Sequence, residues 1–313
     1  MHSPTQLIII SGKGGVGKTS IAASLGYTLS LKGKKVLFVE VNSENQLPRL
    51  LGNKGSGYQE AEVAPGLFAI SITGEEAARE YLRIRLVVKL ASRLLFGNPF
   101  FNYIFQYLIE SIPGLTDLFT LGKVWDIQKF GHRREKRWWY DFIILDAPPS
   151  GRGLPFLKIP EVVISTLRRG PVVEEARKIQ GFLSDRERVQ LYIVTIPEEM
   201  AVTEAIQSFR QAEGELQIRL GPVIVNGVSP QLFKPEEKEW IKSQSSPSEP
   251  LSILVNLARV RNRREDNQRS EIKHLQDELP RVSLIEVPLL FGTSLNKDDF
   301  KRIGEILFRE IKL

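Results

Sequence analysis

The chain has 313 residues, of which 42% are hydrophobic and 26% charged, so its composition excludes disorder and suits one large α/β domain or a domain with an insertion. It contains no cysteine, which excludes disulfides, thiolate zinc sites, iron–sulfur clusters and thiol chemistry. Its net charge of +6 favours anionic partners such as nucleotide, acidic protein surfaces or anionic lipid, and it fits simple solvation equally well.

The predicted elements begin with a strand buried on both faces, because residues 7–10 are a continuous apolar run. A glycine-rich turn follows, then a helix over 19–31 and a second buried strand over 36–39. Further buried strands are predicted at 68–72, 142–145, 191–194, 223–225 and 284–287. Helical stretches separate most of them, which predicts an α/β fold with a mainly parallel sheet and helices on both faces.

Residues 75–130 break this alternation with a helical leucine pattern and then an aromatic cluster, formed by Phe96, Phe100, Phe101, Tyr103, Phe105 and Tyr107. We expect a sheet domain formed by residues 1–74 and 131–313, with residues 75–130 as a helical insertion subdomain. The aromatic cluster suits a groove for a client helix. Core or dimer contacts are the more frequent role of such residues.

The last third of the chain predicts a mobile connection over 242–250, which is rich in Ser and Pro, and a charged helix over 259–279. An amphipathic helix is expected over 298–311. Because it carries charges of both signs, we expect it to pack on the body, so that membrane contact is indirect at most. The first residues show neither a basic flank nor a long apolar run, and we expect a cytoplasmic protein.

The segment from Gly12 to Thr19 matches the phosphate-loop pattern G-x-x-x-x-G-K-[ST], between a predicted strand and a predicted helix. Glycines let the backbone turn its N–H groups toward an anion, and the helix adds a partial positive charge at its N-terminus. Lys18 should reach the β/γ-phosphates of ATP, and Thr19 should bind Mg²⁺. The predicted nucleotide-binding residues of this loop are Gly12, Lys13, Gly14, Gly15, Val16, Gly17, Lys18, Thr19 and Ser20.

A second candidate element follows the predicted strand 142–145, where Asp146 precedes Ala-Pro-Pro-Ser and Gly151. An acidic residue that ends a buried strand beside a phosphate loop is placed to hold Mg²⁺ through water. An ordinary strand-end aspartate is the alternative. Gly151 has no side chain and can present its N–H to the terminal phosphate.

The second lysine of the loop, Lys13, gives the chain a resemblance to a known class. The run Lys13-Gly14-Gly15-Val16-Gly17-Lys18-Thr19 resembles the deviant Walker A motif of the ArsA, MinD and ParA ATPases. In that class the extra lysine crosses a dimer interface to the partner's nucleotide. The resemblance therefore implies a homodimer with ATP between the subunits, formed in response to nucleotide.

Within this class the chain is most similar to the ArsA family, over roughly residues 7–310. Asp146 to Gly151 resembles the family's switch II, and Asn226 resembles its adenine-reading asparagine. The predicted insertion falls where the family places a client or effector subdomain. The resemblance implies ATP hydrolysis with Lys13, Lys18, Asn42 and Asp146 as catalytic residues.

Three features depart from the family pattern. Switch I usually carries an Asp that orients the attacking water, whereas this chain has Asn42, which cannot accept a proton. We therefore expect slow hydrolysis unless Glu40 or Glu44 assists. Without cysteine, neither the thiolate metalloid site nor the zinc of the eukaryotic-type dimer can form. The chain also holds one half where arsenite-pump ATPases usually fuse two, which argues against arsenite transport.

Three alternatives stay open. The first is a positioning ATPase of the MinD or ParA type that acts on a membrane or on DNA. The second is an ATP-dependent small-molecule enzyme, and the third is a nucleotide-binding module that does not hydrolyse ATP. The basic and aromatic segment 132–139 would suit nucleic acid, but a solvated loop with packed tryptophans is the favoured interpretation, so nucleic acid is not an expected partner.

Overall fold

The computed structural model describes residues 5–42, 46–52, 57–89, 114–130, 140–244, 249–290, 292 and 295–312. They form one eight-stranded sheet with the order β3-β4-β2-β5-β1-β6-β7-β8. The strands are β1 (Gln6–Gly12), β2 (Val36–Val41), β3 (Ala61–Ala64), β4 (Leu67–Ile72), β5 (Phe142–Asp146), β6 (Val189–Thr195), β7 (Arg219–Val228) and β8 (Leu284–Pro288). Every neighbouring pair is parallel except β3 and β4. The predicted fold class is confirmed.

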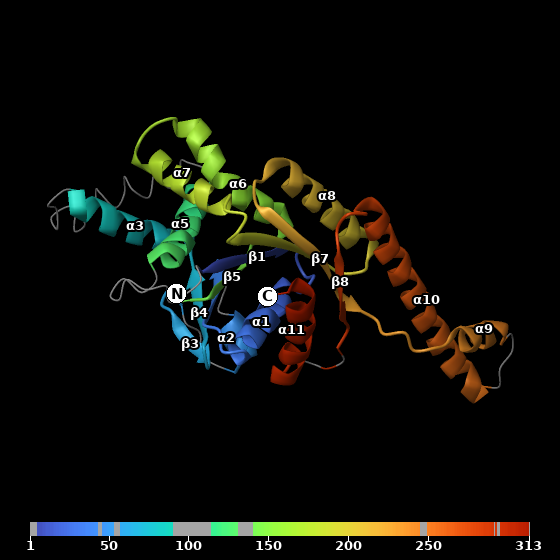
Figure 1. Cartoon of the computed structure of the whole chain (residues 1–313). Helices are drawn as coiled ribbons and strands as arrows, with labels where there is room; N and C mark the ends of the chain where they lie inside the picture. Colours follow the sequence, from blue (N-terminus) through green and yellow to red (C-terminus); the bar gives the residue numbers. More distant parts are fainter. Residues whose placement is uncertain are drawn as a thin grey trace.

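Helices cover both faces of the sheet (Figure 1). One face carries α1 (Lys18–Leu31), α2 (Gln46–Leu50) and α11 (Lys297–Ile311). The opposite side holds α3 (Gly74–Lys89), α5 (Leu115–Phe130), α6 (Ser150–Leu167), α7 (Pro171–Leu183) and α8 (Glu199–Glu215). Two further helices, α9 (Pro235–Ser243) and α10 (Glu249–Glu278), connect β7 to β8.

Strand periodicity explains the two layers. In β1, Leu7 and Ile9 join the core beneath α5, α6 and α7, whereas Ile8 and Ile10 join the core beneath α1 and α11. Successive side chains point to opposite faces of a strand, so a continuous apolar run fills both cores. The central strands are therefore anchored on both faces, and the loops at their carboxyl ends start from a rigid scaffold.

The terminal helix packs closely on α1, as expected from its apolar side. Phe300, Ile303 and Leu307 of α11 are buried there. A Cβ added to Gly304 would lie 2.0 Å from Thr28 Oγ1, so the two backbones approach as closely as glycine permits. Asn296 caps the helix by accepting from the N–H groups of Asp298 and Asp299.

The predicted insertion 75–130 is described only in part. Residues 90–113, with the whole aromatic cluster, lie outside the described residues, as does the basic and aromatic segment 132–139. The last part of the predicted insertion forms α5, where Leu118, Leu121 and Val124 are buried in the main core together with side chains from β1 and β2. This part of the segment therefore helps to build the central body.

The helical pair α9 and α10 extends away from the body as an arm (Figure 1). We use the term arm for the loop 229–234, α9 and α10. The predicted connection over 242–250 was wrong at both ends, because α9 continues to Ser243 and α10 begins at Glu249. Pro250 lies in the first turn of α10, where a helix tolerates proline because that N–H has no partner within the helix.

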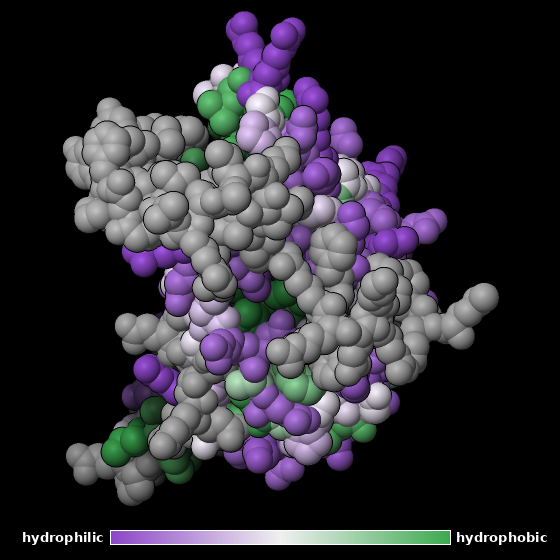
Figure 2. Space-filling model, turned by 90° about the vertical axis from the view of Figure 1, so that its left-hand side faces the viewer, coloured by the Kyte–Doolittle hydropathy of each residue, from purple (hydrophilic) through white to green (hydrophobic). Residues whose placement is uncertain are grey.

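The surface of the body is largely polar on one side (Figure 2). Figure 2 views the α3 and β3 side, where the coloured residues are mainly hydrophilic and apolar ones gather in small groups. Among the helices that the structure describes, none combines the length and apolar character needed to cross a membrane.

Candidate functional site

The phosphate loop connects β1 to α1, at the carboxyl edge of the sheet. Gly15 and Gly17 have φ angles of +85° and +88°, which side chains rarely adopt. A Cβ on Gly12 would lie 2.1 Å from the carbonyl oxygen of Val194, and one on Gly17 would lie 2.3 Å from Asn226 Nδ2. By contrast, a Cβ on Gly14 would meet nothing within 4 Å. Both ends of the loop are thus tightly packed while its centre stays open, as a phosphate cradle requires.

Lys18 and Thr19 begin α1 directly behind this loop. Lys18 is buried, and its Nζ donates to the carbonyl oxygen of Lys13 at 3.1 Å. Burial lowers the pKa of Lys18, opposed by the negative charges of Asp146 and Glu204. A triphosphate would add negative charge beside this buried lysine and so stabilise its charged form.

Thr19 and Asp146, the two predicted magnesium ligands, are in contact with each other. The hydroxyl of Thr19 donates to Asp146 Oδ2 at 2.6 Å, while Oδ1 is buried without a hydrogen-bond partner. Burial raises the pKa of Asp146 to about 6, against the hydrogen bond from Thr19 and the charge of Lys18, which lower it. An orphaned carboxylate oxygen beside a hydroxyl suits Mg²⁺, which keeps several waters and takes few protein ligands. Once bound, the ion would neutralise charge on the phosphates.

The other loop lysine lies on the outer side of the site. Lys13 Nζ is 3.5 Å from Glu204 Oε2 on α8, and both side chains are about one-third exposed. This ion pair was missed at the sequence level, because no local pattern connects a loop lysine to a glutamate on a helix after β6. Lys18 is thus buried against its own loop, while Lys13 lies partly exposed at the rim of the phosphate loop.

Asn226 lies beside the loop but bonds to its backbone. Its Nδ2 donates to the carbonyl oxygen of Val16 at 2.9 Å, so β7 braces the phosphate loop. The contact of Asn226 with adenine stays a prediction. A small residue is required at Gly17, because the asparagine amide fills the space where a Cβ would be.

The predicted switch residues lie at neighbouring strand ends. Asn42 follows β2 with φ of 50°, and Gly151 lies exposed in the first turn of α6. Glu40 is buried beside Asp146 in the strand register, and its Oε1 accepts from the N–H of Leu47 at 2.9 Å. Burial also raises the pKa of Glu40. Of the two suggested helpers, Glu40 is therefore anchored to α2, and Glu44 lies outside the described residues.

One more residue of the switch II region emerges from the structure. A Cβ on Gly153 would lie 2.6 Å from Ser11 Oγ and 2.9 Å from the carbonyl oxygen of Pro148. The first turn of α6 therefore lies directly against the end of β1. The sequence signal for this contact was the pair of glycines, Gly151 and Gly153, after Pro-Pro-Ser. It indicated a close approach only once the structure placed α6 against the end of β1.

Comparison with known proteins decides the family. Residues 5–172, more than half of the chain, match the family model of anion-transporting ATPases, the ArsA ATPases. The chain belongs to the ArsA family of ATPases. The matched region includes the phosphate loop, Asn42 and Asp146, whereas Glu204 and Asn226 lie beyond it.

Several curated relatives support this assignment. ATPase BagA of Mycobacterium tuberculosis is 30% identical over 75% of this ArsA-family chain and 68% of the relative. The arsenical pump-driving ATPase of Acidiphilium multivorum is 26% identical over 72% of the chain and 40% of that protein. ATPase GET3 of Komagataella phaffii is 26% identical over 62% of the chain and 60% of that protein.

Proposed function

We propose that this ArsA-family ATPase is a dimeric switch that binds Mg-ATP between two copies and couples nucleotide state to a protein client or effector. The observation that carries the proposal is the division of labour between the two loop lysines. Lys18 is buried against its own loop, whereas Lys13 is partly exposed and paired with Glu204 at the rim. A rim lysine can leave a weak ion pair for the phosphates of a second copy.

Hydrolysis in this scheme uses electrostatics and positioning. Lys18 and the loop N–H groups stabilise charge on the transferred phosphoryl group, and Thr19 and Asp146 would hold the Mg²⁺ that neutralises more of it. Asn42 orients water without accepting its proton, which makes turnover slow. The closed dimer then reopens, and the segment 75–130 reports the state to the client or effector.

The decisive experiment is the solution mass by light scattering without nucleotide, with ADP and with a non-hydrolysable ATP analogue. We expect a compact dimer only with the analogue. Lys13→Ala should still bind the analogue but stay monomeric, whereas Lys18→Ala should lose nucleotide binding. Lys32→Ala, at the far end of α1, is the matched control and should behave as the unaltered protein. An unchanged dimerisation and ATPase rate in Lys13→Ala would refute the proposal.

The proposed coupling to a client has its own test. Vesicle and DNA co-sedimentation with the analogue distinguishes a positioning ATPase from a client-coupled one. Under our proposal neither surface retains the protein in an ATP-dependent manner. ATP-dependent retention would move the assignment to the positioning class while leaving the nucleotide site unchanged.

A further inference from the structure

The arm carries an apolar surface on its outer part. Six large apolar side chains are more than half exposed there, and we call them the arm patch: Leu232, Trp240, Ile253, Leu254, Leu257 and Val260. The four on α10 follow the spacing of one helix face. Next to them, a groove of about 760 Å³ lies between α9 and α10, lined by Phe233, Trp240, Leu254 and Leu257 among others.

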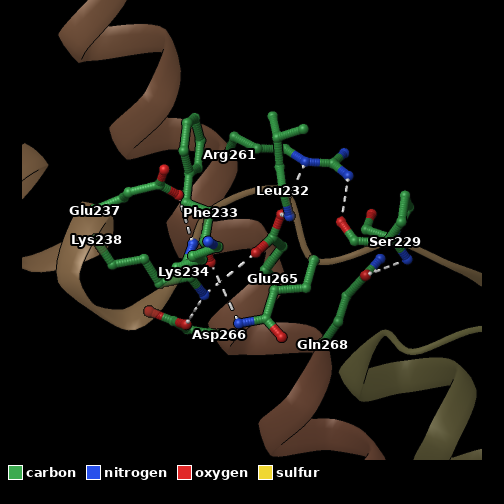
Figure 3. Close-up of polar contacts among 12 residues, drawn as sticks. Ser229, Leu232, Phe233, Lys234, Glu237, Lys238, Arg261, Glu265, Asp266 and Gln268 are labelled. Carbon is green, nitrogen blue, oxygen red and sulfur yellow. Dashed lines mark hydrogen bonds and ion pairs between the residues drawn. The ribbon is translucent and has the colours of Figure 1, made fainter.

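The arm is held together from within, so the patch is presented on a built support (Figure 3). Glu265 is only 4% exposed and pairs with Lys238 of α9 and Arg261 of α10, each at 3.2 Å. Its Oε1 also accepts from the backbone N–H of Leu232 at 3.2 Å. A buried carboxylate with two cationic partners fixes the angle between α9 and α10.

The arm starts at the nucleotide edge of the sheet. Asn226 of β7 contacts the phosphate loop, and three residues later the N–H of Ser229 donates to Gln268 Oε1 at 2.9 Å. The end of β7 is thus level with Gln268. The part of α10 before it, residues 249–267, therefore extends past the strand by roughly 28 Å at 1.5 Å per residue.

From this geometry we infer that the arm patch packs against a second copy of the chain in the ATP-bound dimer. The inference rests on the proposed function, because a copy that faces the phosphate loop also faces the extended arm. Six half-exposed apolar side chains amount to roughly 600 Å² of surface, at the upper limit of what monomers leave exposed. A stable interface needs about 800 Å² from each partner, so the patch together with the nucleotide edge would suffice.

Charge also favours a like partner. Exposed Glu236 and Glu239 on α9 and exposed Arg263 and Arg264 on α10 place both signs around the patch. A two-fold contact between identical surfaces can pair each acidic residue with a basic residue of the other copy. A purely anionic or purely cationic partner would leave one of these groups opposed by like charge.

The first test is dimerisation of the full chain by light scattering with the non-hydrolysable ATP analogue. The double variant Leu254→Ser/Leu257→Ser should weaken the dimer about tenfold or more, as expected when central apolar contacts are lost. Leu31→Ser removes a side chain of similar exposure (54%) at the end of α1 away from the phosphate loop, and it should leave the dimer unchanged. Analogue binding by the monomer should be the same in all three proteins, which shows that each is folded.

A second measurement uses the absence of cysteine. Val260→Cys gives a protein with a single thiol, whose reaction with a maleimide should slow about tenfold when the analogue is added. Leu31→Cys should react at the same rate in both states. Slower labelling at Val260→Cys alone would show that the patch is covered in the dimer.

Two results would overturn the inference and leave the proposed function intact. One is an analogue-dependent dimer that requires Lys13 but neither weakens in the double variant nor protects Val260→Cys. The other is loss of flotation with phosphatidylglycerol vesicles in the double variant without any effect on the dimer, which would make a membrane the occupant. Failure of the unaltered protein to dimerise would instead refute both proposals together.

Discussion

At the scale of single residues, one oxygen of the Asp146 carboxylate has a hydrogen-bond donor and the other does not. Thr19 donates to Asp146, yet Oδ1 of that carboxylate has no partner and its pKa is raised to about 6 by burial. A buried carboxylate with too few partners costs free energy until a ligand supplies them. The raised pKa of Asp146 therefore marks the position at which a bound cation would stabilise this carboxylate.

This cost predicts that Asp146→Asn stabilises the nucleotide-free protein. The folded-state pKa of about 6 exceeds the ordinary value of 3.8, so ionisation of Asp146 disfavours the folded state. The penalty is absent below pH 4 and complete above pH 6, where it reaches about 3 kcal/mol. Urea unfolding at pH 7.5 should show nearly this gain, and at pH 5 the gain should fall to about half.

The same variant supplies its own control through the ligand. Mg-ADP should raise the unfolding midpoint of the unaltered protein far more than that of Asp146→Asn, because the variant lacks the carboxylate that faces the ion. Equal stability of the two proteins at pH 7.5 would mean that Asp146 is well solvated, contrary to the buried Oδ1.

A second residue-scale prediction concerns the attacking water. Asn42→Asp should raise kcat for ATP hydrolysis by about tenfold or more, because a carboxylate accepts the proton that an amide cannot. Steady-state phosphate release under saturating ATP measures it. Gln217→Glu, an exposed amide-to-carboxylate change just before β7, should have no effect. An unchanged rate in Asn42→Asp would indicate that proton acceptance does not limit turnover.

At the scale of elements, the helix that starts at the phosphate loop is fixed by its neighbour. Gly304 of α11 lies so close to α1 that a Cβ would approach Thr28 Oγ1 and the carbonyl oxygen of Ser24, the latter at 2.2 Å. This contact holds α1 in place behind the loop. Small residues at a helix crossing permit such proximity, and any larger one forces the helices apart.

We therefore predict that Gly304→Ala destabilises the protein by about 1–3 kcal/mol, as overpacking does. Its matched control is Gly181→Ala in α7, where an added Cβ meets nothing within 4 Å. That substitution should be neutral or stabilising by about 0.5–1 kcal/mol, since alanine favours the helix. Denaturant unfolding of both variants distinguishes them by sign. Similar destabilisation of the two would show that backbone effects, not the contact with α1, dominate.

At the scale of the whole molecule, sequence patterns predicted the central architecture because that part obeys local rules. Apolar runs such as residues 7–10 and 142–145 became the buried strands, and the motif at Gly12 predicted its own loop between β1 and α1. The edge strand β3 escaped prediction, since Ala61–Ala64 is short and mixed in polarity. Contacts between distant segments, such as Lys13 with Glu204, follow from topology and have no local signature.

The arm shows a second limit of pattern reading. Charged residues dominate α10 because much of it is exposed, so only its later turns gave a helical signal. Ser and Pro near residue 250 suggested a connection, and of the described residues there Pro250 lies in the first turn of α10. The bracing of α9 by Glu265 depends on partners about 30 residues apart, which no window of helix length contains.

The bond between Ser229 and Gln268 has a mechanical consequence. It joins the strand that braces the phosphate loop to the side of a long helix, at a point roughly 28 Å from the start of that helix. A rotation of about 5° at this pivot would carry the far end through roughly 2.5 Å, because displacement grows with radius. In the proposed dimer, a small movement of the loop on loss of a phosphate would thereby be magnified into a separation wide enough to break van der Waals contact.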